Sequence, residues 1–167
     1  MVRIEAVLDS WKTIRSDTAQ AVEEFPAEAM DFRPVPDLMS FRENAMHILN
    51  AGNGLAGLLL DGVDNMAIPE FREMLKKHAS PIGGEASPVE LAAELRRAIE
   101  ELNAKLAAQS PEFYAGMITR SDGQKATRLE MLQMVKEHEL THRSQLFLFQ
   151  RLKGLVPPTT RRRMAKK

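Results

Sequence analysis

The sequence contains no cysteine. This absence excludes a disulfide framework, thiolate ligands for a metal and a cysteine nucleophile. Any metal site in the chain must therefore be built from imidazole or carboxylate groups.

The sequence also lacks a net charge and a long apolar run. Lys+Arg and Asp+Glu both number 23, so the chain has no general attraction to nucleic acid or to an anionic membrane. The longest apolar stretch, LAGLLL, ends at Asp61 and is too short to span a bilayer. The amphipathic first 15 residues lack the apolar core of a signal peptide. We therefore expect a cytoplasmic protein that does not enter membranes and acts on a small-molecule substrate.

The length of 167 residues and the hydrophobic content of 44% fit one domain with a core of its own. Four segments repeat apolar residues at helical spacing. They cover approximately residues 2–24, 41–60, 87–106 and 127–154. The last three begin with the capping-box pattern, in which a serine or threonine is followed three positions later by a glutamate. These pairs are Ser40 and Glu43, Ser87 and Glu90, and Thr127 and Glu130.

Shorter elements are predicted between the long helices. Pro69 opens a helical stretch to about Lys77, and Pro111 opens another short turn. The turn at 121–123 (Ser-Asp-Gly) could belong to a small hairpin. Because no series of strands is evident, we predict an all-α four-helix bundle over residues 1–154.

The end of the chain is basic. Residues 151–167 contain seven lysines and arginines and no acidic residue. Without interleaved aromatic residues, such a run is typical of a solvated segment, so we predict a flexible tail over residues 155–167. Nucleic-acid binding by this tail is the weaker alternative.

Two histidines of the last helix carry the strongest chemical signal. His138 and His142 stand four positions apart, so their side chains project to one side about one turn apart. The same sector holds Met131 and Phe149, which marks it as the side that faces the core. A metal ion bound by both rings would satisfy one nitrogen of each. Rings that line a wet groove, or that bond to neighbouring groups, are the alternative.

His47 adds a third imidazole from another helix. It shares a sector with Ala51, Leu55 and Leu58, which again faces inward. On its own, His47 would be interpreted as a core residue with satisfied hydrogen bonds. It supports a metal site only in combination with His138 and His142. Three nitrogen ligands suit zinc or nickel and leave a position open for water or substrate. The fourth histidine, His78, lies in a connecting segment and is predicted to be solvated.

The string from His138 to His142 also matches the zinc-protease motif H-E-x-x-H, with Glu139 as the acid. Those proteases take a third ligand from further along the chain, and no His, Asp or Glu follows Arg143. No sheet is predicted that could bind an extended peptide. We therefore disfavour a protease. Glu139 lies about 100° around the helix from His138, where it could support a ligand or reach a neighbouring helix.

Three stretches together resemble the DinB-like, or YfiT-like, superfamily of metal-dependent enzymes. They are Phe32-Arg-Pro-Val-Pro-Asp before Ser40, His47 with the following Ile-Leu-Asn-Ala, and Glu137-His138-Glu-Leu-Thr-His142-Arg143-Ser-Gln145-Leu. The resemblance extends over nearly the whole chain, and the spacing of the stretches is more specific than any one of them.

The resemblance implies a four-helix bundle with a long crossover connection and a metal site at His47, His138 and His142. It also implies zinc or nickel as the ion and a homodimer as the assembly. Characterised relatives include transferases and isomerases that use a low-molecular-weight thiol such as bacillithiol or mycothiol. By this analogy, the open metal position would activate a thiol or water for transfer to, or hydrolysis of, a small molecule.

Three further residues are candidates for supporting roles. Asn44 and Gln145 each lie about one turn from a histidine on the inward side, where they could orient a ring or belong to a structural network. Arg143 is expected in a salt bridge rather than at an anionic substrate. Two other interpretations stay open: a non-catalytic, stress-related module that binds a metal or ligand, and a structural histidine cluster without a metal.

Overall fold

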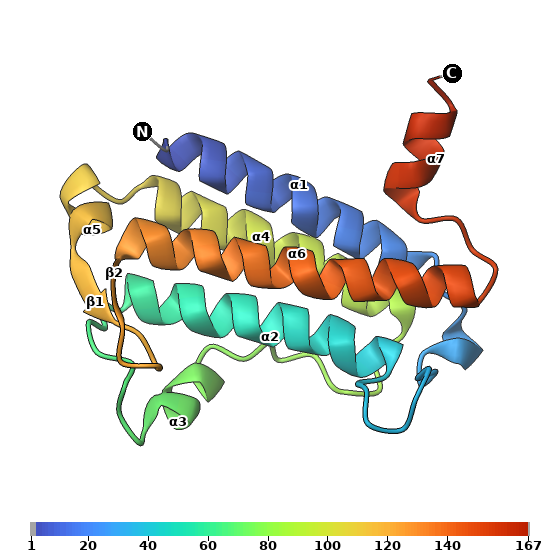
Figure 1. The fold of residues 1–167 in the computed structure, drawn as a ribbon, viewed down its shortest axis with the longest axis horizontal. Helices are drawn as coiled ribbons and strands as arrows, with labels where there is room; N and C mark the ends of the chain where they lie inside the picture. The colour runs from blue at the N-terminus through green and yellow to red at the C-terminus, as the bar shows by residue number, and fades with distance from the viewer. Residues whose placement is uncertain (1–2, 167) are drawn as a thin grey trace.

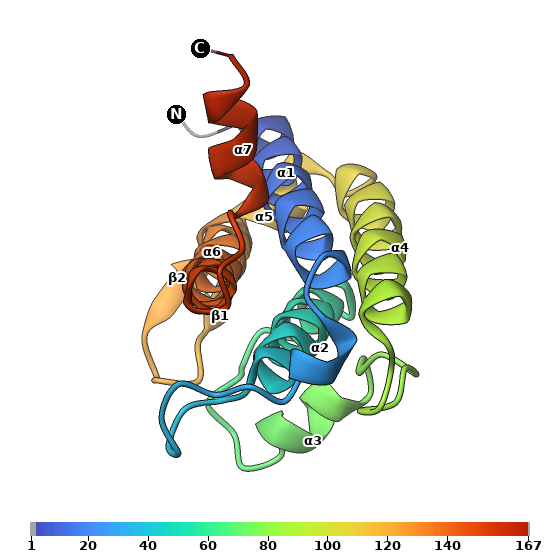
Figure 2. The ribbon, with the colours of Figure 1, turned by 90° about the vertical axis from the view of Figure 1, so that its right-hand side faces the viewer.

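The computed structural model describes residues 3–166, in which four long helices pack side by side (Figure 1, Figure 2). They are α1 (Ile4–Glu23), α2 (Phe41–Leu60), α4 (Pro88–Ala107) and α6 (Arg128–Leu152). Around the bundle the order of neighbours is α1, α4, α2 and α6, so α1 and α2 lie diagonally opposite although they are consecutive long helices. The predicted all-α four-helix bundle is confirmed.

The connection between α2 and α4 is the long crossover. These two helices run in the same direction, so residues 61–87 return along the length of the bundle before α4 begins (Figure 1). The connection contains α3 (Phe71–Lys76), which packs closely on α2. A Cβ atom on Gly54 of α2 would lie 2.9 Å from the side chain of Leu75, so the glycine permits this approach. The crossover expected from the family resemblance is thus present.

The remaining connections are short ordered elements. A 3₁₀ turn, η1 (Ala27–Ala29), follows α1, and α5 (Pro111–Ala115) follows α4. The predicted hairpin is present as the antiparallel pair β1 (Met117–Thr119) and β2 (Lys125–Thr127). Gly123 in its turn has a φ of 80°, a conformation that favours glycine.

The capping boxes predicted for α2, α4 and α6 are all present. In each one the hydroxyl accepts a hydrogen bond from the backbone N–H three residues later, and the glutamate at that position accepts from the cap's N–H. Loss of such a cap costs about 1 kcal/mol. The cap at Ser40 begins α2 seven residues before His47, so it helps to fix where the histidine falls on the helix.

The apolar core consists of two clusters along the bundle. One cluster joins α1, α2, α4 and α6 to the crossover and the hairpin, and the other joins the opposite ends of the long helices. The first contains Trp11, Leu58, Leu59, Met66, Ile99, Leu106 and Leu132 among others, and the second contains Phe25, Met30, Phe41, Leu49, Leu91, Leu95 and Leu146 among others.

Within residues 3–166 no helix combines the length and the apolar character that crossing a membrane would require.

The basic end differs from the predicted flexible tail. Residues Pro158–Met164 form a further helix, α7, which projects away from the bundle (Figure 1). Arg161 Nη2 lies 2.6 Å from Glu24 Oε1 at the end of α1, and Arg162 pairs with Asp17 of α1. The sequence shows the excess of positive charge, but it does not show that acidic groups of α1 lie within reach.

A testable consequence concerns Gly52 of α2, which the long side chain of Arg15 reaches from α1. A Cβ atom there would lie 2.6 Å from Nη2 of Arg15, a side chain with no exposed surface. We expect Gly52→Ala to lower the free energy of unfolding by about 1–3 kcal/mol, the usual cost of overpacking, although alanine favours helix by about 1 kcal/mol. Urea unfolding measures the change. Gly83→Ala is the control, since nothing lies within 4 Å of a Cβ atom there. A Gly52→Ala protein more stable than wild type would contradict the packing.

Candidate metal centre

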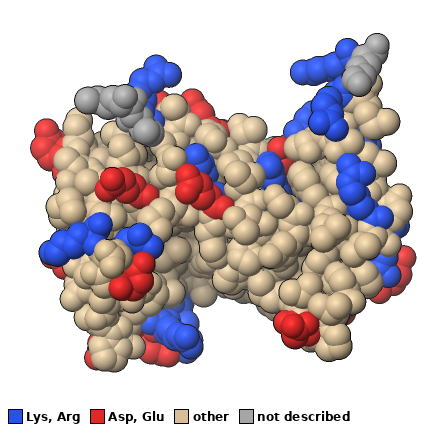
Figure 3. All heavy atoms as spheres, in the orientation of Figure 1, with Lys and Arg blue, Asp and Glu red and all other residues tan. Residues whose placement is uncertain are grey.

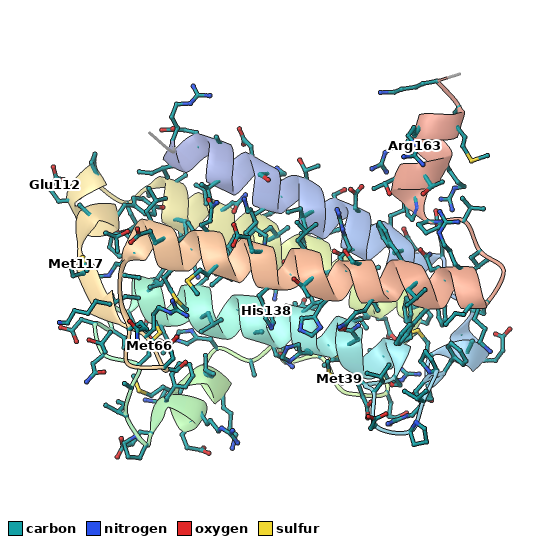
Figure 4. All side chains as sticks on the ribbon, in the orientation of Figure 1. Met39, Met66, Glu112, Met117, His138 and Arg163 are labelled. Atoms are coloured by element: carbon teal, nitrogen blue, oxygen red, sulfur yellow. The ribbon has the colours of Figure 1, made fainter. Side chains whose placement is uncertain are left out.

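The three histidines singled out in the sequence meet in the seam between α2 and α6. His47 comes from α2, and His138 and His142 come from successive turns of α6. Figure 4 shows His138 extending from the middle of α6 towards α2. All three side chains are partly buried. The inward orientation predicted from their angular positions is therefore observed.

The ring nitrogens of the three histidines converge. One nitrogen from each ring lies within 4.8 Å of the others, and Nε2 of His47 is 3.1 Å from Nε2 of His138. The ring centroids are 4.5–4.9 Å apart in all three pairs. Among residues 3–166 this is the only such group of His, Asp or Glu residues. Two ring nitrogens that face each other repel unless a proton or a cation lies between them.

The second nitrogen of His142 is held by two amide side chains. Its Nδ1 lies 2.9 Å from Oδ1 of Asn44 and 3.0 Å from Oε1 of Gln145, and Asn44 Nδ2 donates to the same Gln145 oxygen over 3.1 Å. Because both partners of Nδ1 are carbonyl oxygens, Nδ1 carries the proton and donates it. The lone pair of His142 is then on Nε2, at the other edge of the ring.

Burial keeps two of the rings uncharged. Desolvation, together with the neighbouring His142 and His47, lowers the pKa of His138 to about 4, while the charge of Glu139 has a smaller opposing effect. Desolvation also lowers the pKa of His47, with a further contribution from His142. Both rings are therefore neutral at pH 7, which is the state in which imidazole binds a metal.

These features fit a divalent transition metal. Two nitrogens at 2.0–2.1 Å from a tetrahedral ion lie about 3.3 Å apart, close to the 3.1 Å between His47 Nε2 and His138 Nε2. The bonds from His142 to Asn44 and Gln145 are of the kind that fixes the tautomer of a metal-binding histidine. A set of three imidazoles also leaves coordination positions for other ligands.

The seam lies at a hollow in the surface. In the space-filling view, the lower middle of the face is recessed between the side of α3 and the side of the loop that precedes α2 (Figure 3). His138 lies at about this position in the matching view of Figure 4. The visible floor of the recess shows neither Lys or Arg nor Asp or Glu. A small uncharged molecule could approach the histidines from this side.

Glu139 does not face the histidines. Its carboxylate is 2% exposed and points to α1, where it accepts hydrogen bonds from Trp11 Nε1 over 2.6 Å and from Arg15 Nε over 2.7 Å. The sequence placed it at the edge of the histidine face and left two roles open, and the structure shows the contact with a neighbouring helix. In this position Glu139 cannot act as the base of an H-E-x-x-H protease, because both oxygens are occupied on the α1 side.

Arg143 and His78 also have partners away from the centre. Arg143 Nη1 lies 3.2 Å from Asp17 Oδ2 of α1, which is the salt bridge that the sequence favoured. His78 was predicted to be solvated, but it packs on Gly57 of α2, and its Nε2 lies 2.8 Å from Asp61 Oδ2. It borders a separate cavity of about 280 Å³ between α2 and α4.

Sequence reasoning missed the polar contacts between α1 and α6. Arg15 is fully buried and binds Glu139, yet it attracted no attention within the charged first helix. A signal was available, because Arg15 lies four positions after Trp11 and three before Thr18, in the apolar sector of α1.

The lowered pKa values predict a pH dependence of the metal-free protein. Histidines of the unfolded chain titrate near pH 6.5, whereas His138 in the folded protein titrates near 4. Between these values the unfolded state binds more protons, so the free energy of unfolding falls as the pH decreases from about 6.5 to about 4. Urea unfolding of chelator-treated protein across this range measures the loss. The variant His138→Asn should lose less stability than wild type over the same interval, and equal slopes would contradict the assignment.

Comparison with known proteins agrees with the fold. The sequence profile of the DinB superfamily matches residues 10–146. The structure is similar to a DinB-like protein of Bacillus subtilis, YjoA, with a TM-score of 0.69, 21% identity, and coverage of 89% of this chain and 92% of that one. It is also similar to YfiT of Bacillus subtilis, with a TM-score of 0.69, 18% identity, and coverage of 93% and 91%. That structure is described as "a probable metal-dependent hydrolase with an unusual four-helix bundle topology".

No curated protein matches the chain. The match of the superfamily profile nevertheless spans most of the sequence, from α1 to the C-terminal half of α6, and includes all three histidines. This chain belongs to the DinB superfamily.

Proposed function

We propose that this protein is a metal-dependent enzyme in which His47, His138 and His142 hold one divalent ion, zinc or nickel, at the floor of the surface recess. The observation that carries the proposal is the convergence of three imidazoles, two of which, His47 and His138, bring their Nε2 atoms to 3.1 Å. Support also comes from YfiT, a structurally similar protein described as a probable metal-dependent hydrolase.

The residues around the centre have separate tasks. Asn44 and Gln145 hold the proton of His142 on Nδ1 and so direct its Nε2 lone pair to the site. Burial keeps His47 and His138 unprotonated at neutral pH. An ion held there would act as a Lewis acid that lowers the pKa of a bound thiol or water and so favours the nucleophilic anion.

The surroundings of the site support the proposed substrate class. The recess has no charged floor, and the chain has no cysteine to serve as a nucleophile. We therefore propose transfer of a low-molecular-weight thiol to a small electrophile, or hydrolysis of a small molecule. In both cases the attacking group is supplied from solution.

A second function is favoured by one observation. Glu139 is the carboxylate next to His138 in the sequence, and it is fully engaged with Trp11 and Arg15 on the side of α6 that faces α1. It is therefore not free to move protons at the centre. A non-catalytic module that binds a metal or ligand is consistent with this arrangement.

The metal site is tested by elemental analysis of protein purified without a histidine tag and then loaded with zinc or nickel. We expect about one ion per chain in wild type and none retained by His142→Ala. The chain offers a matched control in His78→Ala, which removes the histidine that lies outside the cluster and should leave the stoichiometry unchanged. Wild-type protein that cannot be loaded, or equal affinity in His142→Ala, would overturn the proposal.

Catalysis is tested on the loaded protein with bacillithiol, mycothiol or glutathione and a panel of electrophiles, and with small esters and amides in a parallel hydrolysis assay. We expect turnover that falls at least 100-fold in His47→Ala, because the ion is lost. Stoichiometric metal without turnover in either panel would favour the binding module. Equal turnover in wild type and His47→Ala would place the chemistry outside this centre.

A further inference from the structure

The contact between α1 and α6 contains a buried polar network. Arg15 has no exposed surface and Glu139 is 2% exposed, and the two form a bidentate pair with Nε–Oε1 at 2.7 Å and Nη2–Oε2 at 2.8 Å. Trp11 Nε1 donates to Oε2 over 2.6 Å, and Thr18 Oγ1 lies 3.4 Å from Oε1. One carboxylate of α6 is thus held by groups from three turns of α1.

A contribution to stability does not by itself explain why Arg15 and Glu139 form a buried ion pair. Removing two charges from water costs several kcal/mol for each ion, and apolar residues of similar size often replace a buried pair without loss of stability. The carboxylate of Glu139 differs from an apolar side chain in the contacts that it makes. Its hydrogen bonds are directional, so they define one rotation and one height of α6 against α1.

The same network reaches the helix that carries His47. The guanidinium of Arg15 lies against α2 at Gly52, where a Cβ atom would come within 2.6 Å of Nη2. Gly52 is five positions beyond His47 in α2, and Glu139 directly follows His138 in α6. Arg15 therefore contacts both of the helices that carry the histidines.

Small rotations of α6 matter for a metal site. A ring nitrogen about 7 Å from a helix axis moves about 1.2 Å when the helix turns by about 10°. Distances between a metal and its ligands are defined to about 0.2 Å. Contacts that fix the rotation of α6 would therefore affect metal binding far more than they affect the packing of apolar side chains.

We propose that Trp11, Arg15 and Glu139 are positioning residues for the histidine centre: they hold α6 in the rotation that brings His138 and His142 to His47. This inference rests on the proposed function in that the ion is expected at these histidines. It assigns to the glutamate of the H-E-x-x-H string a role in orientation, exerted through the helix rather than on the reacting groups.

The test compares stability with metal binding in a variant that replaces the whole network. In the triple variant Trp11→Phe, Arg15→Met and Glu139→Leu, apolar groups take the place of the buried charges and of the indole donor. Co²⁺ is the probe, with its affinity measured by competition and its visible absorption spectrum recorded. Circular dichroism gives the melting temperature of the metal-free protein. We expect a folded variant that binds Co²⁺ at least 10-fold more weakly and shows an altered spectrum.

Leu132→Ala is the matched control on the same helix. It removes buried apolar volume from α6 six positions before His138 and leaves the network intact. We expect a lower melting temperature with Co²⁺ affinity within about threefold of wild type. The control therefore separates loss of stability from loss of position.

A second variant covers the case in which the triple variant does not fold. Glu139→Gln keeps the size of the side chain and one acceptor oxygen, and it should also weaken Co²⁺ binding more than Leu132→Ala does at a comparable melting temperature. Nuclear magnetic resonance of the metal-free protein gives an independent readout, since the ring signals of His138 and His142 should shift in this variant. Folded variants with wild-type affinity, spectrum and ring signals would overturn the positioning role. Wild-type protein that fails to bind Co²⁺ would instead overturn the metal site itself.

Discussion

The placement of α6 between α1 and α2 is the constraint on which the rest of the structure depends. On one side, Glu139 is tied to Arg15 and Trp11 of α1, and on the other side His138 and His142 meet His47 of α2. Both sets of contacts are directional and partly or fully buried. Apolar packing brings the helices together, but a helix with an apolar stripe can turn by some degrees at little cost. The polar contacts at its two edges remove that freedom.

Much of the fold was predictable because local signals in the sequence agree with one another. Capping boxes at Ser40, Ser87 and Thr127 set the starts of three helices to within a residue, and prolines and glycines mark the connections. The convergence of the histidines was also predictable, since each shares an angular sector with apolar residues. The contact of Gln145 with His142 follows from their spacing of about one turn on α6, whereas the contact of Asn44 with His142 depends on the packing of α2 against α6.

Other features depend on the tertiary arrangement, which periodicity does not specify. The sequence shows that Glu139 lies at the edge of the histidine face, but not that α1 supplies a buried arginine at that edge. The segment that forms α7 was expected to be a flexible tail. Its ion pairs with Glu24 and Asp17 could not be predicted, because the sequence does not show that α7 lies beside α1. For His78, the missing information was the close approach that Gly57 permits.

The separation of the histidines along the chain has a consequence for the order of folding. His47 and His138 are 91 residues apart, on opposite sides of the crossover, of α4 and of the hairpin. Bringing such distant segments together is entropically costly until the intervening elements have packed. During synthesis, a ribosome-bound chain that ends before α6 presents a single imidazole from this group. We therefore expect the centre to form late in folding, after the rest of the bundle has packed.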